Sequence, residues 1–186
     1  MGKVIRFFNY DAALSYYEDK IKHMRQASTG RHDGVRIIAK PILILSLIKG
    51  IKEGIFIGNH FDYQMVNKLD EGLFRQYFVQ GRQRNLTPLC YPFYFLTTDE
   101  FWHLSWKVTG KIKTESPSKA WLERNVDFGY IDEELWILLA NDEYRDRLKQ
   151  YVVENNIIQP LHDIDIAAES HIKDGLKAFV TLLLAI

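Results

Sequence analysis

The chain has 186 residues, of which 47% are hydrophobic and 13% aromatic, and its formal net charge is zero. This composition is typical of a globular protein and excludes a disordered chain. The longest apolar runs, Ile42–Ile48 and Phe179–Ile186, are far shorter than the roughly 20 residues that a membrane-spanning helix needs. The lone Cys90 excludes an internal disulfide, and the start of the sequence has no signal-peptide pattern. We therefore expect a cytoplasmic protein with no membrane partner.

Charge is unevenly divided along the chain. Residues 20–52 carry eight basic residues and one acidic residue, a net charge of +7. Residues 127–186 carry twelve acidic and five basic residues, a net charge of −7. Two interpretations stay open: one surface faces a polyanion, or the two parts attract each other in the fold.

Hydrophobic periodicity predicts a mainly helical chain. Pro41 stands in the first turn of a strongly apolar helix, where its missing N–H is not needed. Asp132 is placed to cap a helix whose first turn holds Glu133 and Glu134. The expected helices cover residues 11–26, 42–52, 62–79, 132–139 and 141–155, with another after Pro160, and a short strand is expected at residues 54–58.

Residues 90–106 contain seven Phe, Tyr and Trp side chains and the imidazole of His103. The pattern predicts two short strands joined by a polar turn at residues 97–100, with Pro92 fixing the angle at which the chain begins the hairpin. Such a hairpin is either ordinary core or a rigid wall with an apolar concavity at its mouth. Together the elements predict an α+β fold, a mostly helical single domain with a small antiparallel sheet.

Four strings of sequence, taken in order, resemble one family. They are Lys40-Pro41 with the apolar helix after it, the aromatic strings 91–96 and 101–104, the string 126–139 and the string 144–148. The family is the N-terminal recognition domain of HNH-type restriction endonucleases, which includes the sulfur-binding domain that detects phosphorothioate-modified DNA. The resemblance covers roughly residues 14–157. It implies a DNA-recognition domain over residues 1–157 and a C-terminal helical extension over residues 158–186.

In the sulfur-binding members, a Tyr-Pro-x-x-Ala string forms a shallow apolar pocket for the non-bridging sulfur. Tyr91 and Pro92 match its first two positions, and the small fifth residue is replaced by Phe95, whose ring could fill the cavity or point into the core. Ala39 stands where the family often has a histidine. Sulfur is larger, softer and less strongly hydrated than oxygen, so apolar surface accepts it more readily.

Basic residues hold the neighbouring phosphates in the sulfur-binding members. Here two polar, basic loops, residues 27–36 and 81–85, and the start of the apolar helix supply such residues. The candidate phosphate contacts are Arg31, Arg36, Lys40, Arg82 and Arg84.

The resemblance implies duplex DNA as the partner, within a restriction or defence system. A nuclease motif of the HNH type is incomplete in this sequence, because Ala168–Lys173 resembles its beginning but only Asp174–Ile186 follows. His60 with Asp62 could bind a metal, but no third ligand sits at a suggestive spacing, so no metal or cofactor is expected.

We therefore expect a recognition module without enzymatic activity, whose nuclease domain is missing or lies on a partner chain. The alternative is a protein–protein interaction or regulatory module that retained the fold and lost DNA binding. A nuclease activity of its own is a more distant third interpretation. The sequence does not indicate an oligomeric state.

Overall fold

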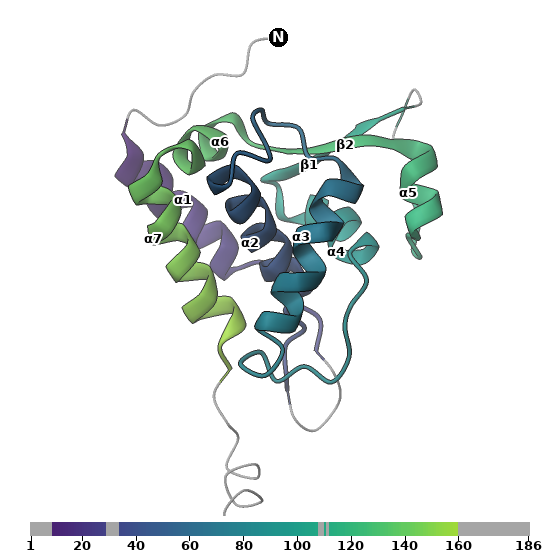
Figure 1. The fold of residues 1–186 in the computed structure, drawn as a ribbon, viewed down its shortest axis with the longest axis horizontal. Helices are drawn as coiled ribbons and strands as arrows, with labels where there is room; N and C mark the ends of the chain where they lie inside the picture. The colour runs from purple at the N-terminus through teal and green to yellow at the C-terminus, as the bar shows by residue number, and fades with distance from the viewer. Residues whose placement is uncertain (1–8, 29–33, 108–109, 111, 160–186) are drawn as a thin grey trace, which may run out of the picture.

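The computed structural model describes residues 9–28, 34–107, 110 and 112–159, and Figure 1 shows their arrangement. Helices dominate this part of the chain, and two short strands form its sheet. The elements are α1 (Tyr10–Lys22), α2 (Ala39–Lys52), α3 (Tyr63–Gln76), α4 (Cys90–Phe95), the 3-10 helix η1 (Leu96–Asp99), β1 (Trp102–Trp106), α5 (Lys119–Asn125), β2 (Val126–Ile131), α6 (Glu133–Ala140), α7 (Asp142–Val152) and the π-helical turn η2 (Val153–Ile157). The predicted α+β fold is confirmed.

Helix α2 is the centre of the domain. Its side chains from Pro41 to Ile48 are all buried, because α3, α4, α6 and α7 pack around it. Figure 1 shows α1 and α7 side by side on one flank of α2, with α3 on the other. The apolar helix that the sequence predicts is thus the buried core element, as expected for a helix that is apolar on nearly every face.

The two strands pair in antiparallel fashion, with Trp102 opposite Ile131 and Leu104 opposite Gly129. Phe61 adds one further bridge, exchanging hydrogen bonds of 2.8 and 2.9 Å with the backbone of Gly129. The fully buried indole of Trp102 lies so close to Gly129 that a Cβ there would collide with it. Glycine at this position therefore lets the tryptophan cover the strand.

The predicted aromatic hairpin is wrong. Residues 90–95 form helix α4 and residues 96–99 continue it as η1, so the partner of β1 is β2 rather than the aromatic string before it. Pro92 is compatible with α4 because it lies in the first turn, where its N–H would have no partner within the helix. The indole N–H of Trp102 donates to the carbonyl of Phe93 at 2.8 Å, which ties α4 to β1. Aromatic clustering here reflects helix packing against a strand.

Two further elements differ from the sequence-based expectation. Residues 54–58 form a turn instead of a strand, with Gly54 at φ +68° and the Gly50 carbonyl accepting from the N–H groups of Ile55 and Phe56. Helix α5 and the strand character of β2 were not predicted, because both are short and flanked by polar sequence. The helix expected after Pro160 lies outside the described residues.

Asp132 precedes α6 as expected, but its carboxylate does not cap that helix. Instead it accepts from the Tyr17 hydroxyl at 3.3 Å and lies 2.8 Å from Nε2 of His103. Burial, followed by the nearby charge of Asp132, raises the pKa of Tyr17 above its ordinary value, so the phenol stays a donor. One carboxylate therefore joins α1, β1 and the start of α6.

The uneven charge is only partly used to hold the fold together. Lys52 and Asp146 form an ion pair of 3.2 Å between the basic first third and the acidic last third of the chain. Lys20 and Lys49 pair with acidic residues outside that last third, Glu100 and Glu53. Among the described residues, attraction between the two parts thus accounts for a fraction of the basic residues.

A buried carboxyl group lies between α2 and α3. Asp70 is 3% exposed, and the Ser46 hydroxyl oxygen lies 3.5 Å from Oδ1 of its carboxyl group. Burial raises the pKa of Asp70 to about 7, and the Ser46 hydrogen bond opposes this shift. The ionised form is therefore disfavoured in the folded protein.

We expect Asp70→Asn to stabilise the protein at pH 8 by about 2 to 4 kcal/mol. The folded pKa lies above the unfolded value, so the wild type binds an extra proton when folded and loses stability as the pH rises from about 4 to about 7. Urea unfolding at pH 5 and pH 8 measures this. An exposed carboxylate elsewhere provides a control, Glu115→Gln, and an equal pH response in the wild type and Asp70→Asn would contradict the prediction.

Candidate functional site

A predominantly apolar cavity of about 550 Å³ opens where the segment after α1, the start of α2 and helix α4 meet. We call it the α4 cavity. It brings together Lys40, Tyr91, Pro92 and Phe95, four residues that the sequence singled out from two separate strings. Its full lining is Arg25, Gln26, Ala27, Ile37, Ala39, Lys40, Thr87, Tyr91, Pro92, Phe95 and Thr98.

Helix α4 forms one wall of this cavity. Tyr91 and Phe95 are four residues apart and therefore lie on the same helix face. Tyr91 is 40% exposed, Pro92 is buried, and Phe95 is half-buried with its ring edge against Tyr94 at a centroid distance of 5.1 Å. Phe95 thus neither fills the cavity nor points into the core, and the space remains open beside its ring. The small side chain of Ala39 lines the same space.

The ammonium group of Lys40 is bound within the protein. It forms an ion pair with Asp99 and lies 3.3 Å from the Thr98 hydroxyl oxygen, and the side chains of Lys40 and Asp99 are only 13% and 7% exposed. Asp99 also accepts the backbone N–H of Arg25 at 3.2 Å. The positive charge of Lys40 is therefore balanced by a carboxylate at the edge of the α4 cavity.

Arg25 is a cavity residue that the sequence-based selection missed. It is exposed, it follows α1, and it lines the α4 cavity. The basic residues that the sequence indicated lie in two loops and at the start of one helix, whereas Arg25 lies just after the end of α1. The available signal was its place within the +7 segment, residues 20–52.

The two basic loops are fastened to each other by the buried side chain of Gln83. Its amide nitrogen donates to the carbonyl of Arg36 at 2.9 Å, and its carbonyl oxygen accepts the N–H of Ile38 at 3.4 Å. Gln159 also donates to that Arg36 carbonyl, at 2.8 Å. Figure 1 shows the described parts of the α1–α2 and α3–α4 connections on the lower side of the molecule as drawn.

The other candidate basic residues lie around these loops and outside the lining of the α4 cavity. The guanidinium of Arg36 donates to the carbonyl of Asn155 at 3.2 Å. Arg82 is half-buried with φ +51°, and Arg84 is exposed. Ile37 follows the first basic loop, between α1 and α2, and Thr87 follows the second, between α3 and α4. Because both residues line the α4 cavity, the two loops lie next to this cavity. Arg31 lies outside the described residues.

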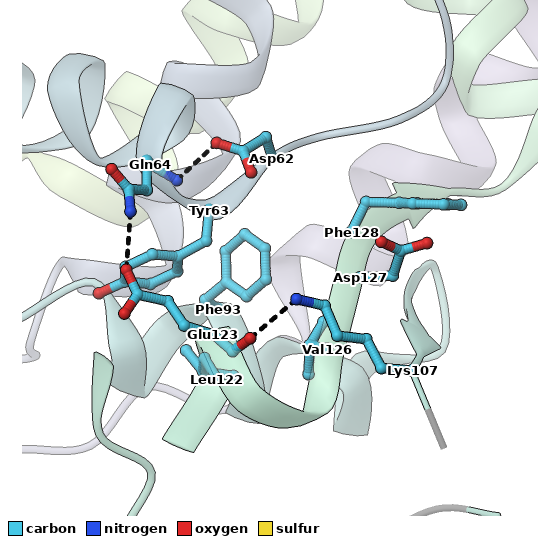
Figure 2. A pocket seen from close by; sticks show the side chains of 10 residues that line it. All are labelled: Asp62, Tyr63, Gln64, Phe93, Lys107, Leu122, Glu123, Val126, Asp127 and Phe128. Carbon is cyan, nitrogen blue, oxygen red and sulfur yellow. Dashed lines mark hydrogen bonds between the residues drawn. The ribbon is translucent and has the colours of Figure 1, made fainter. Parts of the chain in front are cut away.

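A second cavity, of about 310 Å³, has the opposite electrostatic character (Figure 2). Asp62, Glu123 and Asp127 contribute carboxylates to its lining, against the single ammonium group of Lys107. Lys107 donates to the backbone carbonyl of Glu123 at 2.8 Å, and Gln64 donates to the Glu123 carboxylate at 2.8 Å. This acidic cavity is unsuited to a polyanion, because like charges repel.

Among the described residues, no group of three or more His, Cys, Asp and Glu side chains is placed to hold a metal ion. Cys90 is buried, which raises the pKa of its thiol. His103 is engaged by Asp132. Ala168–Lys173, the incomplete nuclease string, lies outside the described part of the chain.

No helix in the described ranges is both long enough and apolar enough to cross a bilayer.

The fold and the α4 cavity define a small α+β domain with an apolar recess beside basic loops. Neither a family model nor a curated protein matches the sequence. Among solved structures, the chain is similar to the sulfur-binding domain of ScoMcrA complexed with phosphorothioated DNA, with 16% sequence identity and a TM-score of 0.56. The match covers 75% of this chain and 86% of that chain. The two proteins share a fold at a distant level of sequence similarity.

We expect Gln83→Ala to lower the free energy of unfolding by about 1 to 3 kcal/mol, because it leaves the Ile38 N–H without its side-chain partner and the Arg36 carbonyl with Gln159 as its remaining side-chain donor. Hydrogen exchange should also show faster opening of residues 34–38 and 81–85 than in the wild type. Gln76→Ala, at an exposed position at the end of α3, serves as the control. Unchanged exchange in both loops would contradict the role of Gln83.

Proposed function

We propose that this chain binds duplex DNA and recognises a phosphorothioate linkage in its backbone at the α4 cavity. The observation that carries the proposal is the convergence of Tyr91, Pro92 and Phe95 as the wall of one open, mainly apolar recess with basic residues beside it. The distant fold likeness to a sulfur-binding domain supports it.

The chemistry of the cavity suits sulfur. A non-bridging phosphate oxygen keeps strong hydrogen bonds with water and loses them without compensation against Pro92 and the Phe95 ring. A sulfur atom in the same place is less strongly hydrated and gains contact with these apolar surfaces. The discrimination therefore comes from the difference in desolvation cost between the two atoms.

The basic residues near the cavity would contact the flanking phosphates. Arg25 lines the cavity, and Arg84 is exposed on the second basic loop. Phosphate contacts fix the position of a protein on the duplex and make its affinity depend on salt. In this arrangement Lys40 acts as a balanced charge in the cavity wall, while arginine side chains supply the electrostatic attraction.

We infer that the DNA-recognition domain, expected over residues 1–157, serves a restriction or defence system in the cytoplasm. The cleavage step would be carried out by a nuclease partner.

Tyr91→Ala should remove the preference for phosphorothioate DNA, because it takes away one exposed side of the cavity wall. We expect the ratio of affinities for modified and plain duplexes to fall about tenfold. Gel shifts at low salt with phosphorothioate, methylated and plain duplexes of one sequence measure it. Tyr10→Ala is a matched control, since Tyr10 is also 40% exposed but stacks on Tyr144, away from the cavity lining.

Three results are informative in this experiment. If no duplex shifts at micromolar protein, DNA binding is excluded and the alternative, a protein-interaction module, takes its place. If plain and phosphorothioate duplexes bind equally, the protein binds DNA without reading sulfur. A Tyr91→Ala variant that still discriminates would remove Tyr91 from the recognition surface.

Arg25→Gln and Arg84→Gln should each weaken binding to modified and plain duplexes alike. Each should also reduce the slope of log affinity against log salt by about 0.9, the value for one phosphate contact. Titrations between 50 and 200 mM salt, a range in which such contacts weigh heavily, provide the measurement. Lys68→Gln, an exposed charge on α3, is the control for loss of a basic residue elsewhere. An unchanged slope in both arginine variants would place the phosphates on another surface.

A further inference from the structure

We propose that Asp99 sets the ligand specificity of the α4 cavity, by holding hydrogen-bond donors away from the bound linkage so that a thiophosphate diester is favoured over a phosphate diester. The proposal rests on the proposed function and deepens it. Asp99 was not among the sequence-based candidates, and nothing in the aromatic string indicates its role.

Asp99 occupies two donors at the edge of the cavity. Its Oδ2 receives the ammonium of Lys40, and its Oδ1 receives the backbone N–H of Arg25 at 3.2 Å. Both Lys40 and Arg25 belong to the cavity lining. Without this carboxylate, an ammonium and an N–H group would be available to a ligand at that place.

Two further polar side chains of the lining, Gln26 and Thr98, also form hydrogen bonds within the protein. The amide nitrogen of Gln26 donates to the carbonyls of Ile37 and Asn156 at 3.2 and 3.1 Å. The Thr98 hydroxyl donates to the carbonyl of Phe95 at 2.8 Å. An oxygen placed at the part of the wall formed by Lys40, Thr98 and Gln26 therefore meets donors that already have partners, together with the apolar side chains beside them.

Net charge cannot distinguish the two linkages, because a phosphate diester and a thiophosphate diester each carry one negative charge. They differ in how well the non-bridging atom accepts hydrogen bonds, and oxygen is the stronger acceptor. A free ammonium would compensate oxygen for its lost hydration more than it would compensate sulfur. Removing the donor leaves oxygen uncompensated, which is how a binding site rejects an unwanted ligand.

The fold places Asp99 where this function requires it. Residue 99 ends η1, which continues directly from α4, so the segment that carries Tyr91 and Phe95 also carries the carboxylate. The side chain is 7% exposed, so bulk water screens its interaction with Lys40 weakly. The wall and the counter-charge therefore come from one continuous segment.

The test compares Asp99→Asn with the wild type in binding to plain and phosphorothioate duplexes of one sequence. We expect Asp99→Asn to bind plain DNA about tenfold more tightly, and the preference for modified DNA to fall by a similar factor, because Lys40 becomes free to donate to a phosphate oxygen. The salt dependence for plain DNA should steepen by about 0.9 in log–log slope. Glu100→Gln, at the exposed neighbour that pairs with Lys20, makes the same change in net charge and should alter binding to both duplexes equally.

A double variant keeps the proposal testable if the single change disturbs the fold. Adding Lys40→Met to Asp99→Asn removes the ammonium together with its partner, so the preference for phosphorothioate DNA should return toward the wild-type ratio. Urea unfolding of all variants shows whether each is folded at the binding temperature.

The outcomes separate this inference from the proposed function. Wild-type protein that fails to bind DNA, or fails to prefer the modified duplex, overturns the proposed function itself. Wild-type protein that prefers the modified duplex, together with folded Asp99→Asn of unchanged preference, overturns the role of Asp99 alone. A loss of preference in Asp99→Asn that the double variant does not restore also overturns it, because the ammonium would then not be the cause.

Discussion

The buried pair of Lys40 and Asp99 is the interaction on which the arrangement of the α4 cavity depends. Lys40 lies in the first turn of the central helix α2, and Asp99 ends the segment that follows α4. Breaking a pair that is largely shielded from water leaves an uncompensated charge, which lowers stability, so the pair fixes how α4 faces the start of α2. The Arg25 N–H adds the segment after α1 to the same carboxylate. Three segments distant in sequence thus meet at one side chain.

A second carboxylate, Asp132, joins elements in a comparable way at a different place. It connects Tyr17 of α1 and His103 of β1 to the start of α6. In both cases an acidic residue at the end or the edge of a short element accepts several donors, which satisfies polar groups that burial would otherwise penalise. The side-chain amides of Gln83 and Gln159 connect the loops in a similar way, because both donate to the carbonyl of Arg36. These contacts, rather than a large sheet, determine where the loops around the α4 cavity lie.

A net charge of zero is compatible with binding to a polyanion because charge is sorted locally. The acidic cavity, which Glu123 lines, and the α4 cavity, which Arg25 lines, are formed by different residues of the same small domain. Much of the basic first third is neutralised by nearby partners, as Lys40 and Lys49 are. The proposed DNA surface therefore depends on a few arginine side chains and on shape, which is consistent with a site that distinguishes sulfur from oxygen by hydration.

The sequence by itself determined the helices with strong apolar periodicity and the α+β class, and it singled out the string around Tyr91 and Pro92 as a candidate site. It could not determine that residues 90–99 are helical, because a short aromatic run has no period that separates a strand from a buried helix. It missed Asp99 and Arg25 because their significance lies in contacts across 59 and 74 positions of sequence, and such contacts leave no local pattern. Only the tertiary structure decided that Phe95 borders an open cavity and that Lys40 has its charge balanced. The physical reason is that the burial of a side chain and its ion pairs are properties of the folded chain. The pattern of residues indicates only which segments have an apolar face that folding would bury.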